Sequence, residues 1–308
     1  MPHRALLALG GALALAGALA ACPTGHVRRE NGAAARQIDL YPLTRVAAGS
    51  FAMGSGASRD EATHPVRVTR AFLMGQEVTQ GLWREVTGER PVATRAQRIA
   101  GRDGGRCAED QGVSFVGDDL PVVCVDWLEA VAFANAMSAR EGLAPAYVID
   151  GTEVRWRRDA GGYRLPTEAE WEWAARGAAR GDVEATACPT ANVADASADR
   201  VWAWGAEPCD DGYPGLAPVG AFAVGAGGLA DLDGNVAEWC WDAYEPYPEG
   251  AVSDPAPEGP SDRPSGHVTR GASFRTRPAE ARPWVRGFGM GNLVSHAVGL
   301  RLVRNAAD

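Results

Sequence analysis

Residues 228–242, GLADLDGNVAEWCWD, are the most informative stretch of the sequence. The first half is rich in Asp, Asn and Gly, which hydrogen-bond their own backbone in turns, and turn formation alone is enough to explain them. The second half is an aromatic run around Cys240. A cysteine among large aromatic side chains is expected to be a buried, unreactive thiol.

Composition excludes several classes of function. The chain has 308 residues, and all thirty of its Lys and Arg residues are arginine. Schiff-base enzymes need a lysine amine and P-loop enzymes need a Gly-Lys-Ser/Thr motif, so both classes are excluded. The formal charge of −9 argues against a nucleic-acid partner. We interpret the missing lysine as compositional bias, because arginine solvates a surface equally well.

The N-terminal segment resembles the signal of a bacterial lipoprotein. Residues 5–20 are apolar but too short to span a membrane stably. The sequence Leu19-Ala20-Ala21-Cys22 that follows resembles a lipobox, with an ordinary secretory cleavage site as the alternative. We therefore expect a signal peptide at 1–21, a lipid on Cys22 and a polar tether at 22–44. The proline after Cys22 favours the outer membrane of the cell envelope.

Export would permit disulfides, and the remaining cysteines are well placed for them. No CxxC motif occurs, so neither a zinc knuckle nor a thioredoxin-like dithiol is indicated. Neighbours along the chain are expected to pair, Cys107 with Cys124 and Cys188 with Cys209, leaving Cys240 free.

Local patterns predict short elements separated by long loops. Alternating apolar residues predict strands at 45–55 and 65–74. Helix caps predict three helices, which run from Thr79 to Gly88, from Asp126 to Gly142 and from Thr167 to Gly177. A hairpin is predicted at 147–156, turned by Asp150-Gly151. The chain after residue 180 is expected to be mostly loop, including a surface loop at 245–264.

Ten blocks of sequence follow one another along the chain in a fixed order. They are FAMGS (51–55), DEATHPVRV (60–68), EVTQGLW (77–83), PVVCVDWLEAVAFAN (121–135), GYRLPTEAEWEWAARG (162–177), VWAWG (201–205), PVGAF (218–222), GLADLDGNVAEWCWD (228–242), RGASF (270–274) and GLRLVR (299–304). In order and spacing they resemble the formylglycine-generating enzyme family, also called sulfatase-modifying factors. The resemblance implies a single α+β domain at 45–304 with a C-type lectin-like fold and a short tail at 305–308.

The resemblance also implies two structural calcium sites. The first would use the side chains of Asp231 and Glu238 with the carbonyls of Gly234 and Val236. The second would use the side chains of Asn192 and Asp211 with the carbonyls of Val193 and Tyr213. Calcium binds six to eight oxygens from mixed carboxylates and carbonyls, and irregular loops supply such sets.

The family's copper chemistry is not expected here. The resemblance implies two cysteines, five residues apart, that hold copper(I) between the RGASF and GLRLVR blocks. That interval, Phe274 to Val298, contains no cysteine. Copper(I) is a soft ion that prefers thiolate, so copper is not expected to bind.

Other catalytic arrangements are also unsupported. A histidine metal site would need His64, His267 and His296 to converge, and isolated surface or capping histidines are the common case. No GxSxG motif is present. Glu168 and Glu170 are explained by a helix start, where carboxylates interact favourably with the helix dipole.

Two classes of function remain. The first is a lipid-anchored module that binds a protein or peptide ligand in a groove containing Arg282, Trp284 and Arg286, residue types that are enriched at binding hot spots. Plain packing and surface charge explain the same three residues equally well. The second class is an active family oxidoreductase, either a formylglycine generator with a different ligand set or a divergent periplasmic oxidase.

Overall fold

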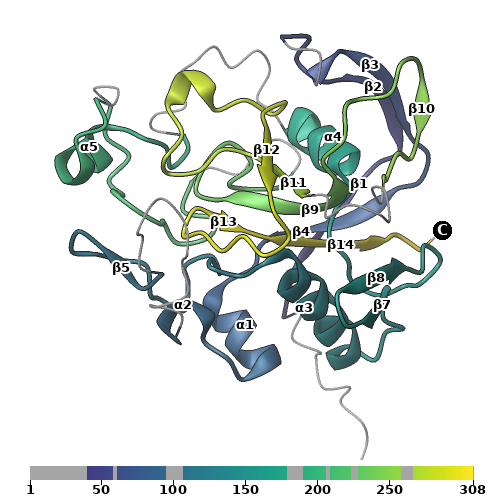
Figure 1. The fold of residues 1–308 in the computed structure, drawn as a ribbon, viewed down its shortest axis with the longest axis horizontal. Coiled ribbons are helices and arrows are strands. Elements are labelled where there is room, and N and C mark those ends of the chain that lie inside the picture. The colour runs from purple at the N-terminus through teal and green to yellow at the C-terminus, as the bar shows by residue number, and fades with distance from the viewer. Residues whose placement is uncertain are drawn as a thin grey trace, which may run out of the picture. The chain divides into compact units, whose positions relative to one another are not determined.

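A four-stranded sheet in the middle of the fold contains the second half of the 228–242 segment as strand β9 (Figure 1). Its strand order is β12-β11-β9-β13, with β9 at Ala237–Ala243, β11 at His267–Arg270, β12 at Arg286–Gly289 and β13 at Val298–Gly299. Six of the seven residues of β9 are buried. Buried aromatic residues therefore alternate along this strand with two buried acids, Glu238 and Asp242.

The computed structural model describes residues 40–57, 61–94, 107–178, 190–205, 209–222, 228–257 and 266–307. Residues 40–308 form one compact unit. The predicted signal peptide, the lipid attachment site Cys22 and most of the predicted tether lie outside the described residues.

Two three-stranded sheets are built from segments near the N-terminal end of the unit and from segments late in the sequence. The first has the order β1-β4-β14, with β1 at Leu43–Val46, β4 at Phe72–Glu77 and β14 at Arg301–Asn305. The second has the order β10-β3-β2, with β10 at Val252–Ser253, β3 at His64–Val68 and β2 at Gly49–Met53. Both sheets therefore join segments that are far apart in the sequence.

The remaining described elements are two hairpins and several short helices. The hairpins pair β5 (Glu109–Asp110) with β6 (Val113–Ser114) and β7 (Tyr147–Asp150) with β8 (Glu153–Trp156). The helices are α1 (Gln80–Thr87), α2 (Pro91–Thr94), α3 (Trp127–Arg140), α4 (Glu168–Ala178), α5 (Ala196–Trp202) and the 3₁₀ turn η2 (Pro278–Glu280).

Side-chain caps start the helices where the sequence predicts them. Thr79 accepts a hydrogen bond from the backbone of Leu82 at the start of α1, and Gly88 ends that helix in the left-handed conformation. Asp126 forms a full capping box with Glu129 at the start of α3. The three predicted helix starts are confirmed, because a cap is a local interaction within one turn.

The third helix also begins with a capping box, and its predicted end is wrong. The backbone N–H of Thr167 donates to the Glu170 carboxylate at 2.9 Å, and that of Glu170 donates to the Thr167 hydroxyl at 3.1 Å. Helix α4 continues through Gly177 to Ala178. A single glycine lowers helix stability by only about 1 kcal/mol, which packing can offset.

Three other sequence predictions differ from the structure. The strands predicted at 45–55 and 65–74 are each divided into two strands of different sheets, β1 with β2 and β3 with β4. In the predicted hairpin, Asp150 pairs with Glu153, so the turn contains Gly151 and Thr152 rather than Asp150-Gly151. The region after residue 180 also contains helix α5, which Asp195 caps.

Aromatic packing fills the core around α3 and β9. Trp83 of α1 stacks on Phe133 of α3 with ring centroids 4.4 Å apart, and Trp241 of β9 packs between Trp127 and Tyr147. Mixed short helices and mostly antiparallel strands confirm the predicted α+β class. Among the described helices, none has the length and apolar character needed to cross a bilayer.

Candidate functional site

The loop that leads into β9 has a strained backbone held by buried polar contacts. Asp231 and Asn235 adopt positive φ angles of 61° and 67°, a conformation in which Asp and Asn are enriched among non-glycine residues. The Asn235 amide nitrogen donates to Glu77 at 2.6 Å, and its amide oxygen accepts from the backbone of Ala217 at 2.9 Å. Asn235 therefore ties this loop to β4.

Three buried carboxylates surround a single buried arginine at this loop. Arg301 donates to both oxygens of Glu238, from Nε and from a terminal nitrogen, at 2.6 Å each. Glu77 and Asp231 are 1% and 8% exposed, and each interacts electrostatically with Arg301. One guanidinium therefore faces three carboxyl groups, leaving an excess of negative charge.

The pKa values of these groups reflect that imbalance. Burial, together with a smaller effect of the charge of Glu238, raises the pKa of Asp231 to about 6. Burial, with the charges of Asp231 and Glu238, raises the pKa of Glu77 well above its usual value. A bound cation would favour the charged form of each group.

The second predicted site brings two distant segments together. The carboxylate of Asp211 accepts the backbone N–H of Val193 at 3.0 Å and that of Tyr213 at 2.8 Å. Burial raises the pKa of Asp211 to about 6. Three of the four residues predicted for this site therefore lie in direct contact.

A close backbone approach links the two predicted sites. The Asn192 amide nitrogen donates to the side-chain oxygen of Asn235 at 3.0 Å, and the Asn192 carbonyl accepts the backbone N–H of Asn235 at 2.8 Å. A Cβ atom on Gly234 would lie 2.3 Å from that carbonyl. Gly234 must therefore remain glycine for the two loops to meet.

Unpartnered oxygen atoms mark both predicted calcium sites. Eight buried side-chain nitrogen or oxygen atoms of the described residues have no hydrogen-bond partner, and only two of them are oxygens. These are Oδ1 of Asp231 and Oδ1 of Asn192, one from each site. Buried acceptors without a donor are unfavourable, and calcium takes carboxylate and amide oxygens as ligands, so both donor sets fit the ion.

Carbonyl and amide oxygens would have to complete both sites. The described part of the chain contains no group of three or more His, Cys, Asp and Glu side chains arranged to hold a metal ion. The Glu238 carboxylate is also shared with Arg301 and with the Trp171 indole, which donates at 2.7 Å. The first site therefore offers calcium a carboxylate that already has partners.

Sequence reasoning missed three buried charged residues that interact with the two predicted sites. Glu77 and Arg301 were assigned only to sequence blocks, and nothing local shows that they meet Glu238. Asp195 is fully buried, caps α5 through Ser197 at 2.8 Å and accepts the backbone N–H of Asp211. The signal for Asp195 was available, because Asp is a preferred helix N-cap residue.

The predicted ligand groove requires a correction at Arg286. Its side chain is 1% exposed and forms an ion pair with Glu168, with Nε to Oε1 at 2.6 Å and a terminal nitrogen to Oε2 at 2.9 Å. The guanidinium also lies 4.3 and 4.2 Å from the ring centroids of Tyr244 and Tyr247. Arg286 therefore holds the fold together and is not available to a ligand.

The other two groove residues are half-buried and also engaged. Arg282 donates to the carbonyls of Pro278 and Ala281 at 3.0 and 2.9 Å. The guanidinium carbon of Arg176 lies 5.3 Å from the centroid of the Trp284 ring. These contacts favour the packing interpretation of the segment over the binding interpretation.

Arg270 forms a second buried ion pair next to Arg286. It bonds Glu168 at 3.1 Å and also Glu172, and all three side chains are less than 5% exposed. Sequence analysis assigned Glu168 only to a helix start. In the structure it forms ion pairs with both Arg270 and Arg286, which lie more than 100 positions further along the chain.

The described cysteines are oxidised or buried. A disulfide joins Cys107 to Cys124, the pairing expected from their positions along the chain. Cys209 is also disulfide-bonded, and its predicted partner Cys188 lies outside the described residues. Cys240 is free and fully buried, and burial raises the pKa of its thiol well above the usual value.

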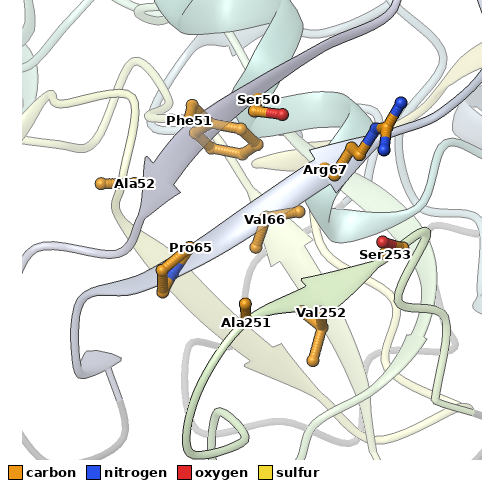
Figure 2. Close-up of a pocket in the computed structure, with 9 residues that line it drawn as sticks. All are labelled: Ser50, Phe51, Ala52, Pro65, Val66, Arg67, Ala251, Val252 and Ser253. Atoms are coloured by element: carbon orange, nitrogen blue, oxygen red, sulfur yellow. The ribbon is translucent and has the colours of Figure 1, made fainter.

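Two surface hollows lie near one another along β3 and β10. Figure 2 shows the larger one, a cavity of about 460 Å³ over β2, β3 and β10. Its lining is mostly apolar, with two serines and with Arg67 at one end. The smaller one, of about 330 Å³, lies between the β3–β4 turn, the end of β8 and the start of α4. Val68 and Asp254, which line the smaller hollow, directly follow Arg67 and Ser253 of the larger one.

Comparison with known proteins identifies the family. The sequence model of the sulfatase-modifying factor enzyme 1-like domain matches residues 28–306. The chain belongs to the sulfatase-modifying factor family. The resemblance of the ten sequence blocks is thereby confirmed.

The chain is similar both to a protein named as a chaperone and to a named enzyme. The chaperone protein LppX of Paenibacillus barcinonensis is 28% identical over 231 residues, covering 67% of this chain and 73% of that protein. The formylglycine-generating enzyme of Thermomonospora curvata is 36% identical over 163 residues, covering 50% of this chain and 44% of that enzyme. This chain therefore matches less than half the length of the curated enzyme.

A solved structure confirms the fold. The Treponema denticola variable protein 1 superposes with a TM-score of 0.68 at 25% sequence identity, covering 86% of this chain and 95% of that one.

Proposed function

We propose that this chain is a lipid-anchored, calcium-stabilised member of the sulfatase-modifying factor family that binds a protein or peptide ligand and lacks the family's copper oxidase activity. The observation that carries the proposal is the absence of any cysteine between Phe274 and Val298. Copper(I) needs soft thiolate ligands, and none is offered in that interval.

The free thiol within the described residues gives the oxidase no substitute. Cys240 is fully buried in β9, next to Glu238 and Asp242. Burial raises the pKa of its thiol, so the thiolate that would bind copper is disfavoured. The name of the relative LppX, a chaperone, supports binding to other proteins as the function that remains.

Calcium would have a structural role in this proposal. Asp231 and Glu238 would hold one ion, and Asn192 and Asp211 the other, together with the carbonyls of the same loops. The ion would supply positive charge beside the carboxylates around Arg301 and a partner for the two unpartnered oxygens. The lipid on Cys22 rests on the lipobox, and placement in the cell envelope rests on that lipid.

Copper analysis and oxygen uptake test the proposal. The purified chain, loaded with copper(I) and then desalted, is assayed with a cysteine-containing sulfatase peptide. The Thermomonospora enzyme serves as positive control. We expect copper well below one equivalent and no peptide-dependent oxygen uptake. Stoichiometric copper with turnover would overturn the proposal in favour of the oxidoreductase alternative.

A further inference from the structure

We propose that the smaller hollow, at the start of α4, binds the carboxylate of a peptide, either an acidic side chain or a free C-terminus. The inference rests on the proposed function in taking the ligand to be a peptide. The cavity of about 330 Å³ is within the size range of ligand sites. Its lining includes Arg70 from the β3–β4 turn and Trp156, Arg158 and Arg164 from the segment between the end of β8 and α4.

The tryptophan at this pocket is a platform for two of the arginines. The guanidinium carbons of Arg158 and Arg164 lie 4.7 and 4.9 Å from the centroid of the Trp156 ring. Cation–π attraction holds guanidinium groups over such a ring, most strongly for tryptophan. The two cations are therefore positioned before any ligand arrives, which lowers the entropy lost on binding.

Two N–H donors in the pocket wall have no acceptor. Arg164 is 3% exposed, and its terminal nitrogens donate to both oxygens of Glu170 at 2.6 and 2.7 Å. Its Nε and the Trp156 indole Nε1 are buried with no hydrogen-bond partner among the described residues. Buried donors are nearly always satisfied in folded proteins. Arg164 and Trp156 therefore each keep one N–H without an acceptor at residues that line the pocket.

Arg70 supplies an available charge at the rim. It lines the pocket, is exposed, and has no hydrogen bond or ion pair with the described part of the chain. The first turn of α4 also lines the pocket, and the positive end of a helix dipole favours an anion there. A guanidinium fork matches the two oxygens of a carboxylate.

The acidic residues of the pocket select a single negative charge. Glu170 is held by Arg164, and Asp254 accepts the backbone N–H of Thr69 at 2.8 Å. Asp159 is exposed and has no partner within the described residues. Three arginines face three carboxylates, so the lining is formally neutral. A doubly charged phosphate would be repelled more strongly by Asp159 than a carboxylate would be.

The neighbouring hollow favours a peptide over a small organic acid. The apolar cavity in Figure 2 ends at Arg67 and Ser253, and the next residue of each segment lines the carboxylate pocket. An extended peptide could place apolar side chains in the first cavity and its carboxylate in the second.

Isothermal titration calorimetry with defined peptides tests the inference. The probe is an acetylated, amidated peptide, Ala-Leu-Glu-Leu-Ala, and the comparison is the same peptide with Gln in place of Glu. A third peptide carries Gln and a free C-terminus, which separates a side-chain carboxylate from a terminal one. We expect at least one carboxylate peptide to bind about tenfold more tightly than the neutral peptide, a difference of about 1.4 kcal/mol.

Two arginine variants localise the effect. Arg70→Gln should remove most of the preference for carboxylate, while melting at the wild-type temperature. Arg155→Gln is the matched control, because Arg155 is exposed on the same hairpin as Trp156 but does not line the pocket. It should keep the preference.

Three results would overturn the inference. They are equal or undetectable binding of all three peptides, a preference that survives Arg70→Gln, and displacement of the peptide by inorganic phosphate at equal concentration. The copper and oxygen measurements are independent of these peptide titrations. Turnover of the sulfatase peptide would refute the proposed function. Absence of a carboxylate preference would refute only the assignment of this pocket as a carboxylate site.

Discussion

Removing calcium should lower the melting temperature of the fold, because the ion would no longer interact with the two unpartnered oxygens. A ligand that binds only the folded state stabilises it by RT ln(1 + [L]/Kd). Extracellular calcium modules bind with Kd of about 10⁻⁴ M, so about 10 mM calcium contributes about 2.7 kcal/mol per site. For a unit of this size, each kcal/mol shifts Tm by about 2–4 °C. Each site should therefore raise Tm by about 5–10 °C.

Asp231→Asn makes this prediction specific to the first site. The substitution keeps an oxygen and removes one of three carboxyl groups that face Arg301. Burial raises the pKa of Asp231 to about 6, roughly two units, so the charged carboxylate costs the metal-free fold about 3 kcal/mol. The variant should therefore be more stable than the wild type in chelator, and calcium should stabilise it less.

Thermal unfolding followed by circular dichroism measures both effects. Wild type, Asp231→Asn and the exposed control Asp159→Asn are melted in calcium, in magnesium and in chelator. The control should respond to calcium as the wild type does. A wild-type Tm that is the same in calcium and in chelator would refute the calcium sites. A calcium shift that Asp231→Asn leaves unchanged would refute the assignment of this residue.

Three further predictions concern stability. Replacing Cys107 and Cys124 with serine should cost about 3 kcal/mol in urea unfolding, because their disulfide closes a loop with a sequence separation of 17; an unchanged midpoint would contradict this. Burial lowers the pKa of His267 to about 4, so the unfolded chain takes up its proton first as the pH falls. Stability should therefore be lost from about pH 6.5 down to about pH 4, by up to about 3 kcal/mol. His267→Gln should flatten that part of the stability curve, and an equally steep curve would count against the buried neutral imidazole. Arg286→Ala should cost about 3 kcal/mol by leaving a buried ion pair broken, and Arg282→Ala less than about 1 kcal/mol; equal small losses would contradict the burial of Arg286.

Helix starts could be predicted because their signals are local. Thr79, Asp126 and Thr167 each bond a backbone N–H within the next turn, so sequence alone contains both partners. The turn before β9 was recognised for the same reason. Asp195 carried an equally local signal, and it was missed because the helix it starts has only seven residues.

Long-range partners could not be predicted in this way. Arg286 was interpreted as a candidate ligand-binding cation because arginine and aromatic residues are enriched at binding hot spots, with plain packing as an equal alternative. Its partner Glu168 lies 118 positions away, and Tyr244 and Tyr247 approach only after β11 and β12 pair. Likewise pairing of β4 with β14 places Glu77 opposite Arg301, and the partner of Arg301, Glu238, lies 63 positions away. Burial of a charge depends on such strand pairing, which single-sequence patterns do not specify.

Mass spectrometry of a sulfatase-derived cysteine peptide tests the central claim most directly. The peptide is incubated with oxygen, reductant and either this chain or the Thermomonospora enzyme, each preloaded with copper(I). The enzyme should convert the cysteine to formylglycine. This chain should leave the cysteine peptide intact, because no thiol pair lies between Phe274 and Val298. Catalytic formation of formylglycine by this chain would contradict the account.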